Sequence, residues 1–164
     1  MSSTGSADDA AAKKPARFGA PSGPKILVKL LGSNNHQWEI HENLLRSCST
    51  YFANRIDQNP CDINEINTLE DWVEPATVQM FGEWLYENTA QATSLHPISV
   101  VKSPFTKDVF SYLKIYVFAV VYEIPDLSRD AFVRVHQYLT IQEHNYKPVV
   151  EQVKYLFDHT KKVT

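Results

Sequence analysis

Histidine and acidic side chains that could bind a metal ion occur close together at His36, Glu39 and His41. Imidazole and carboxylate groups are common zinc ligands, and three of them can hold a zinc ion. This segment alternates polar and apolar residues as a strand does, and side chains on one face of a strand recur every two residues. The odd spacing of the two histidines therefore places them on opposite faces. Because no diagnostic ligand spacing is present either, the sequence predicts no metal site.

A nucleophile for covalent catalysis has no local signature in this chain. The sequence contains no G-x-S-x-G, no C-x-x-C and no catalytic-cysteine motif. Cys48 lies at helical spacing with Leu44, Leu45 and Phe52, which predicts a buried thiol, and apolar burial raises a thiol pKa and makes the group inert. The turn GSNN lacks the further glycines and the lysine of a phosphate loop. We therefore expect a protein that is not an enzyme and binds no cofactor.

Composition restricts the partners and the compartment. Lys and Arg number 16 against 19 Asp and Glu, with a sequence pI near 6.0, so no basic field is available to hold nucleic acid. The longest apolar run, residues 115–122, is much shorter than the roughly 20 residues that span a bilayer. The N-terminal segment lacks the apolar core of a signal peptide, and two cysteines form no disulfide framework. We expect a cytoplasmic or nuclear protein, or both, without a membrane or nucleic-acid partner.

Two strands and a helix are predicted at the start of the ordered chain. Residues 26–30 form an alternating, β-branched-rich run, and the turn GSNN reverses the chain into a second strand in which Trp38 and Ile40 lie two apart. After His41 the apolar residues recur at helical spacing. A strand therefore runs into a helix with almost no linker, and Ser49 can cap the helical turn that follows.

A third strand and a further helix are predicted next. The strand is expected around residues 66–69, and Pro75 suits the first position of a helix, where its missing N–H costs nothing. Residues 89–104 break the pattern with prolines and serines, which indicates a long surface loop.

The C-terminal part of the chain is predicted to be helical. The most apolar segment, from about 106 to 123, should lie near the centre of the fold and end at Pro125. Asp126 or Ser128 can cap another helix. Residues 148–158 carry apolar side chains at helical offsets and predict a last helix.

Aromatic residues are numerous for a chain of this size, with three tryptophans, eight tyrosines and eight phenylalanines. Some of them must fill the core, but aromatic side chains also anchor protein interfaces. Candidates for an interface, with plain packing as the alternative for each, are Leu45, Phe52, Trp84 and Tyr86.

The same segments resemble a known family. A strand hairpin followed by H-x-x-L-L and S-x-Y-F is similar to the signature of the BTB/POZ domain, carried here by His41, Leu44, Leu45, Ser49, Tyr51 and Phe52. VEPATVQMFGEWLYENT resembles the apolar helix of that family that ends in the pair Leu85 and Tyr86. IYVFAVVYEIPDL is similar to its later helix, centred on Ala119. The resemblance covers about residues 25–139, and the late helix at 150–156 is similar to that of short stand-alone BTB proteins of filamentous fungi.

The resemblance implies an α+β fold, with helices packed around a small mixed three-stranded sheet and an extra C-terminal helix. The expected organisation is a flexible tail at residues 1–24, a BTB/POZ domain at 25–140 and a helical extension at 141–164. The tail is poor in large apolar side chains and shows no helix and strand to exchange with a partner. A dimer built on the first helices is therefore expected rather than a strand-swapped one.

The expected function is also implied by the resemblance. The chain would be a non-catalytic protein–protein interaction module that self-associates as a homodimer. The alternative is an adaptor that binds a cullin scaffold in a ubiquitin ligase, or a monomeric linker similar to the Skp-type and elongin-type proteins.

Overall fold

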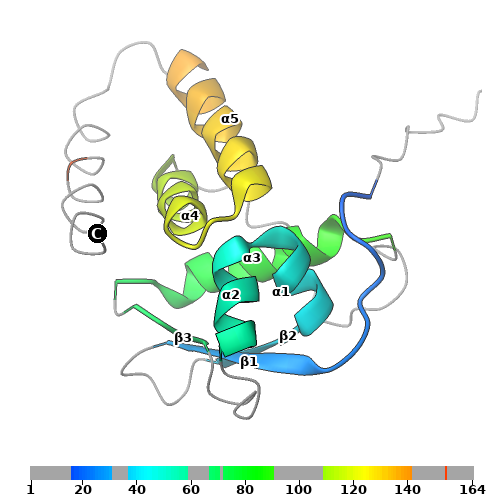
Figure 1. Ribbon diagram of the computed structural model, residues 1–164. Coiled ribbons are helices and arrows are strands. Elements are labelled where there is room, and N and C mark those ends of the chain that lie inside the picture. Colours follow the sequence, from blue (N-terminus) through cyan, green and yellow to red (C-terminus); the bar gives the residue numbers. More distant parts are fainter. Residues whose placement is uncertain are drawn as a thin grey trace, which may run out of the picture.

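The computed structural model describes residues 16–30, 37–58, 67–70, 72–90, 109–141 and 154. Within these residues the chain forms a mixed α+β structure of five helices and one three-stranded sheet (Figure 1). The mixed α+β class that was expected is thus confirmed.

The sheet is built around its first strand. β1 (Lys25–Leu30) pairs antiparallel with β2 (Gln37–His41) and parallel with β3 (Asn67–Leu69), which gives the order β2-β1-β3. The sheet is thus mixed and three-stranded, as expected. Every second side chain of β1 is buried: Ile26, Val28 and Leu30.

The tight junction between strand and helix is confirmed. α1 (Glu42–Cys48) begins at the residue after β2, and α2 (Thr50–Gln58) follows after the single residue Ser49. The Ser49 hydroxyl accepts a hydrogen bond from the backbone N–H of Phe52 at 3.0 Å. Ser49 is therefore the N-cap of α2, because its side chain satisfies an N–H group that has no partner within the helix.

Three longer helices complete the described chain. They are α3 (Pro75–Glu87), with proline in its first turn as predicted, α4 (Val109–Val121) and α5 (Pro125–Ile141). The apolar helix was expected to run to about residue 123 and to be closed by Pro125, and α4 ends two residues earlier, at Val121. Glu123 has a positive φ of 52°, which turns the chain, and Pro125 is the first residue of α5. A proline suits that position because the first N–H groups of a helix have no intrahelical partner.

The two residues expected to cap α5 lie inside this helix. Asp126 is in the first turn of α5, and the Ser128 hydroxyl donates a hydrogen bond to the carbonyl oxygen of Pro125 at 2.9 Å. Neither side chain is therefore the N-cap.

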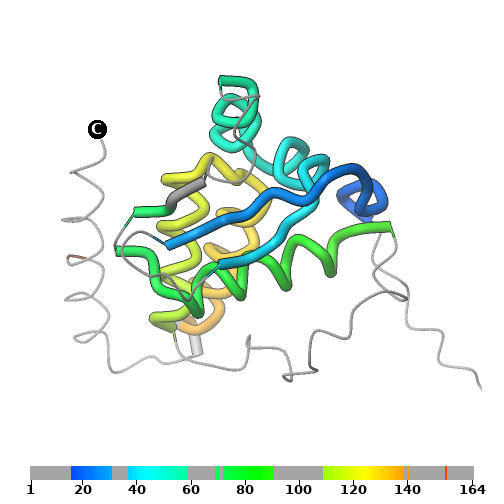
Figure 2. The backbone as a smooth tube through the Cα atoms, turned by 90° about the horizontal axis from the view of Figure 1, so that it is seen from below, coloured from blue at the N-terminus to red at the C-terminus, as the bar shows by residue number. Residues whose placement is uncertain are grey.

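The helices form two levels over the sheet. In Figure 1 the sheet lies at the bottom, α1, α2 and α3 lie above it, and α4 and α5 pack together at the top. Figure 2, which views the molecule from below, shows the strands in front of α4 and α5. None of the helices in the described ranges is long and apolar enough to cross a membrane.

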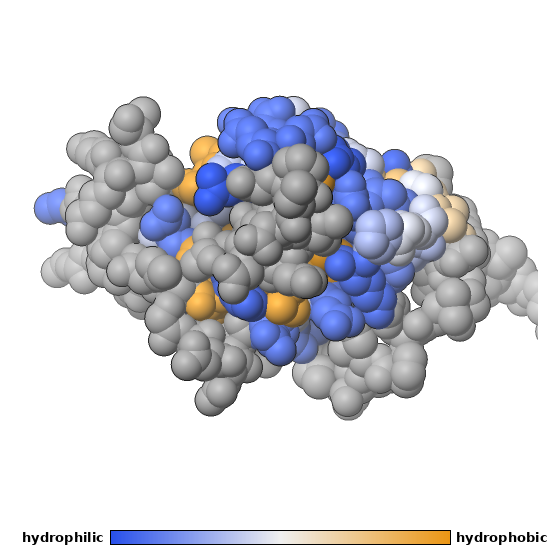
Figure 3. All heavy atoms as spheres, turned by 60° about the horizontal axis from the view of Figure 1, so that its bottom comes forward, coloured by the Kyte–Doolittle hydropathy of each residue, from blue (hydrophilic) through white to orange (hydrophobic). Residues whose placement is uncertain are grey.

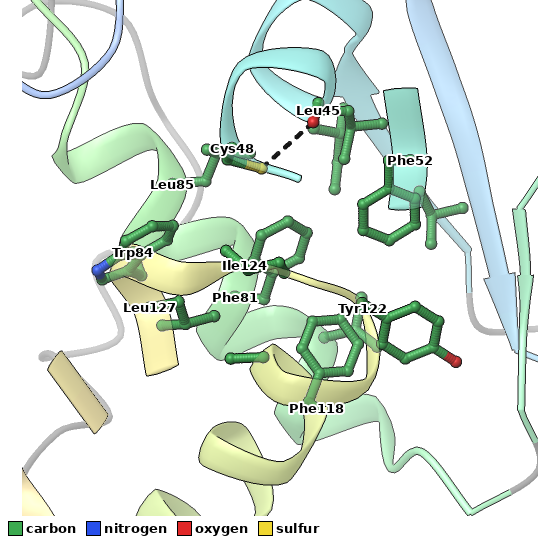
Figure 4. Close-up of a cluster of buried hydrophobic side chains, with 14 of the residues drawn as sticks. Leu45, Cys48, Phe52, Phe81, Trp84, Leu85, Phe118, Tyr122, Ile124 and Leu127 are labelled. Carbon is green, nitrogen blue, oxygen red and sulfur yellow. Dashed lines mark hydrogen bonds between the residues drawn. The ribbon is translucent and has the colours of Figure 1, made fainter. Parts of the chain in front are cut away.

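The core is centred on Tyr122, just after α4. Its ring stacks on Phe52 with 5.6 Å between centroids and an interplanar angle of 3°, and lies 4.7 Å from the ring of Phe118. The Phe81 ring of α3 closes the cluster at 5.3 Å from Phe118 (Figure 4). Side chains from α2, α3 and α4 therefore meet at one point, which confirms that the apolar helix is central.

The tail prediction is wrong for residues 16–24. Phe18 is 7% exposed and belongs to the core, and the N–H groups of Arg17 and Phe18 both donate to the carbonyl oxygen of Asn88, at 2.9 and 3.0 Å. The sequence concealed this contact because one aromatic residue among small residues has no periodicity. Residues 1–15 lie outside the described residues.

Other expectations also fall outside the described residues. These are the loop from residue 91 to 104, Cys61, His36 and, apart from the helical Lys154, the last helix at 148–158.

Candidate interaction surface

Three of the four residues predicted for an interface are core residues. Leu45 and Phe52 are 0% exposed and Trp84 is 4% exposed, and all three point into the cluster drawn in Figure 4. A buried side chain has no area to offer a partner, so the prediction that these three form an interface is wrong for this structure. Each of them lies on the buried face of its own helix, α1, α2 and α3 respectively, which is the packing role that the sequence left open.

Tyr86, the fourth candidate, is half-buried at the end of α3. Its hydroxyl lies 2.8 Å from Nδ1 of His41 and accepts a longer hydrogen bond, 3.3 Å, from the His41 backbone N–H. Burial raises the pKa of Tyr86 above its ordinary value. Tyr86 thus connects α3 to the end of β2, and part of its ring remains accessible.

Cys48 and the acidic and histidine residues show no catalytic arrangement in the described chain. Burial raises the pKa of the Cys48 thiol to about 12, so the reactive thiolate is suppressed, as predicted. Glu39 is exposed and lies 3.7 Å from Lys25. Among the described residues, no three His, Cys, Asp or Glu side chains are close enough to hold a metal ion.

An exposed apolar patch lies on α4 and α5. The large hydrophobic residues that remain exposed in the described chain are Val120 (53%), Phe132 (56%) and Val133 (47%). The half-buried ring of Tyr116, one helical turn before Val120, lies 6.2 Å from Phe132, and His136 lies 6.5 Å from Phe132 on the other side. Tyr116 therefore connects Val120 to Phe132. We call the surface of Tyr116, Val120, Phe132 and its neighbour Val133 the α4/α5 patch.

The first helix pair presents a different surface. Its exposed positions are polar or charged: Ser47, Thr50, Asn54, Arg55, Asp57 and Gln58. On the face that Figure 3 shows, hydrophilic residues predominate in the described part, and apolar residues appear only in small separate areas. Interface centres are usually depleted of charge. The outer surface of α1 and α2 therefore has less of the character of an interface than the α4/α5 patch.

A polar cluster holds the N-terminal arm, residues 16–20, against the ends of α3 and α5. The guanidinium of Arg17 donates two hydrogen bonds to the two carboxylate oxygens of Asp130, at 2.8 and 2.9 Å. The indole N–H of Trp84 donates to the same carboxylate at 3.0 Å. The hydrogen bond to Asp130 raises the pKa of Arg17, so the guanidinium keeps its proton and its positive charge.

Sequence reasoning missed this cluster. Arg17 and Asp130 are separated by 113 positions, and the residues next to each of them form no motif that predicts the ion pair. Trp84 was noticed only as an aromatic side chain, and the only local signal was Phe18, a large aromatic residue in a segment otherwise made of small ones.

Similarity to known proteins gives no further assignment, because no protein-family model, curated protein or solved structure matches this chain.

Proposed function

We propose that this chain is a non-catalytic protein–protein interaction module of the BTB/POZ type and that it associates with a second copy of itself. The observation that carries the proposal is the α4/α5 patch, in which Val120, Phe132 and Val133 are each about half exposed and the Tyr116 ring lies beside Phe132. Contiguous exposed apolar surface is unfavourable in water, and in a soluble domain it commonly marks a binding site.

The arrangement of the elements adds support. A hairpin that enters a helix without a linker, a mixed sheet of order β2-β1-β3 and a central apolar helix occur in the order that the BTB/POZ resemblance implies. A function in binding rather than catalysis also agrees with the burial of Cys48, the cysteine in the described chain, because a buried thiol is unreactive.

The location that we propose for self-association differs from the one expected from the sequence. The first helix pair was expected to carry the dimer, but its exposed side chains are polar, whereas those of the α4/α5 patch include a phenylalanine and two valines. Few residues usually supply most of the energy of an interface, and aromatic side chains are prominent among them. Phe132 is therefore the proposed anchor.

The test is the solution mass of the full chain over a dilution series, measured by light scattering. We expect a species of twice 18.7 kDa that dissociates on dilution. Phe132→Ser should weaken the dimer on the order of 30-fold, the usual effect of losing a strong interface residue. Gln58→Ser is the control, because Gln58 is exposed on α2, outside the α4/α5 patch.

Two outcomes would count against the proposal. A dimer with the same dissociation constant in wild type and Phe132→Ser would refute the placement on α4 and α5. A monomer at every concentration would refute self-association and direct the next binding experiment to a cullin N-terminal region, the partner expected for an adaptor or linker.

A further inference from the structure

The N-terminal arm is bound in the manner of a short extended peptide. Phe18 forms an isolated parallel β-bridge with Thr89, just after the end of α3. The N–H of Phe18 donates to the carbonyl oxygen of Asn88 at 3.0 Å, and the N–H of Ala90 donates to the carbonyl oxygen of Phe18 at 3.1 Å. Main-chain pairing of this kind is how many proteins bind extended peptides without reading their sequence.

Two side chains of the arm supply the sequence-specific contacts. Arg17 forms the two-pronged ion pair with Asp130, a geometry that lysine cannot reproduce. The Phe18 ring packs edge to face on Trp84, with 5.5 Å between the centroids and an interplanar angle of 72°. The bound sequence is thus read as an arginine followed by an aromatic residue.

The receiving surface is held in place by contacts that do not involve the arm. The Trp84 indole N–H orients the Asp130 carboxylate, and in Figure 4 this nitrogen lies at the edge of the core cluster. The Asn88 side-chain amide donates to the carbonyl oxygen of Trp84 at 2.7 Å, and the Thr89 hydroxyl donates to that of Tyr86 at 2.8 Å. The carboxylate, the aromatic edge and the main-chain groups are therefore positioned by α3 and α5 themselves.

The arm itself is fixed by few contacts beyond these. Asn43 of α1 holds the last residue of the arm and the chain just after it. Its amide donates to the carbonyl oxygen of Ala20 at 2.9 Å, and its side-chain oxygen accepts from the N–H of Ser22 at 3.1 Å. Arg17 and Asp130 retain 24% and 29% of their side-chain exposure, so water already reaches the ion pair. Release of residues 16–19 leaves the anchor at Asn43, which holds Ala20 and Ser22, intact.

From this geometry we propose that the surface formed by Trp84, Asn88–Ala90 and Asp130 is a peptide-recognition site that the chain's own arm occupies. Its partner in trans is an extended segment of another protein that presents arginine followed by an aromatic residue, and the arm is a competitor that this segment displaces. A second copy of this chain is not the occupant, because its arm is identical and lacks the high local concentration of the tethered one, on the order of millimolar.

This site is independent of the proposed self-association. Asp130 and Phe132 are two positions apart on α5, about 200° around the helix, so they face different sides. Loss of the dimer would leave the peptide site untouched, and loss of peptide binding would leave the dimer untouched.

The test measures binding of a fluorescent peptide with the sequence of residues 13–20, KKPARFGA, to the full-length chain by anisotropy. In the variant Arg17→Ala/Phe18→Ala the arm can no longer compete. We expect this variant to bind the peptide at least on the order of tenfold more tightly than wild type does. The control peptide has alanine at both the arginine and the phenylalanine position and should not bind.

A charge exchange separates recognition from general effects on folding. Asp130→Lys, added to the arm variant, should abolish binding of KKPARFGA, and a peptide with glutamate in place of the arginine should bind this triple variant better than KKPARFGA does. Absence of peptide binding to a folded arm variant, with an unchanged far-ultraviolet circular dichroism spectrum, would overturn the proposal. So would equal binding of the arginine and glutamate peptides to the Asp130→Lys protein.

Because Phe18 belongs to the core, the arm variant could fail to fold, and hydrogen exchange in the wild-type chain provides a second measurement. The Ala90 N–H, which is bonded to Phe18, should exchange at least on the order of tenfold faster than the N–H groups in the middle of α3, since the arm opens without global unfolding. Equal protection of the Ala90 N–H and the α3 interior would show that the arm opens only with the whole domain, and would overturn the proposal.

Discussion

The hydroxyl of Ser49 joins two parts of the chain that are 73 positions apart, because it donates a hydrogen bond of 2.6 Å to the carbonyl oxygen of Tyr122. The Ser49 hydroxyl oxygen also accepts the bond from the Phe52 N–H that caps α2. Ser49 is 3% exposed, so its hydroxyl, rather than water, bonds to the Tyr122 carbonyl oxygen and the Phe52 N–H. One buried hydroxyl therefore satisfies both the start of α2 and the chain that follows α4.

Replacing Ser49 by alanine should destabilise the domain by about 2 kcal/mol, since it removes a helix cap and leaves a buried carbonyl without its partner. The free energy of unfolding is measured by urea denaturation with circular dichroism. Ser47→Ala is the matched control, because Ser47 is exposed and, within the described residues, its hydroxyl bonds to the carbonyl oxygen of Leu44 alone. A loss no larger than that of the control would show that the Ser49 hydroxyl is not needed.

Leu45 and Phe132 should separate folding from association. Leu45→Ala removes a side chain that is 0% exposed and should cost about 2–5 kcal/mol of unfolding free energy through the cavity that it leaves. Phe132→Ser changes an exposed position and should shift stability by about 0.5 kcal/mol or less, while it lowers the solution mass. Denaturation and light scattering on both variants check this pair. If Phe132→Ser is as destabilising as Leu45→Ala, the exposed placement of Phe132 is wrong.

Tyr122 contributes a hydrogen bond as well as its stacked ring. Its hydroxyl accepts a bond of 3.1 Å from the backbone N–H of Glu70, which follows β3. Tyr122→Phe keeps the ring and leaves that N–H without its partner, so it should cost about 1 kcal/mol. Tyr116→Phe serves as the control because the Tyr116 ring is half-buried and its hydroxyl makes no hydrogen bond within the described residues. Urea denaturation compares the two variants. Equal stability of Tyr122→Phe and wild type would contradict the role of the bond.

Cys48 should make stability depend on pH in the alkaline range. Burial raises its pKa from about 9 to about 12, so the unfolded chain releases the thiol proton at a lower pH than the folded chain does. The stabilisation is complete below pH 9 and is lost as the pH rises from 9 to 12, by about 3 kcal/mol. Unfolding free energies at pH 8 and pH 11 should therefore differ less in Cys48→Ala than in wild type. The same fall in both proteins would disprove the contribution of Cys48.

Native Cys48 should also resist modification. In a Cys61→Ser background, an aromatic disulfide reagent at pH 8 should react with Cys48 only at the rate of unfolding, because the thiol is 6% exposed. Addition of urea above the transition should release full reactivity at once. Rapid reaction of the folded protein would mean that the interior around Cys48 opens locally.

The sequence alone determined the elements, because their signals are local. Alternation in β1, the change to helical spacing after His41, the capping hydroxyl of Ser49 and the proline that begins α3 each act within a few residues. The same local signals placed the end of the central helix at about residue 123, two residues beyond Val121, and did not show that Pro125 begins the next helix, since proline suits that position as well as the residue after a helix.

Only the tertiary structure decided which apolar residues remain exposed and which distant polar groups meet. Trp84 and Phe132 are both large aromatic residues on amphipathic helices, yet one is 4% and the other 56% exposed, because α5 and the N-terminal arm cover the first and nothing in the described chain covers the second. Arg17 and Asp130 pair across 113 positions. Burial and long-range pairing depend on how whole elements pack in space, and sequence periodicity reports only on the element in which it occurs.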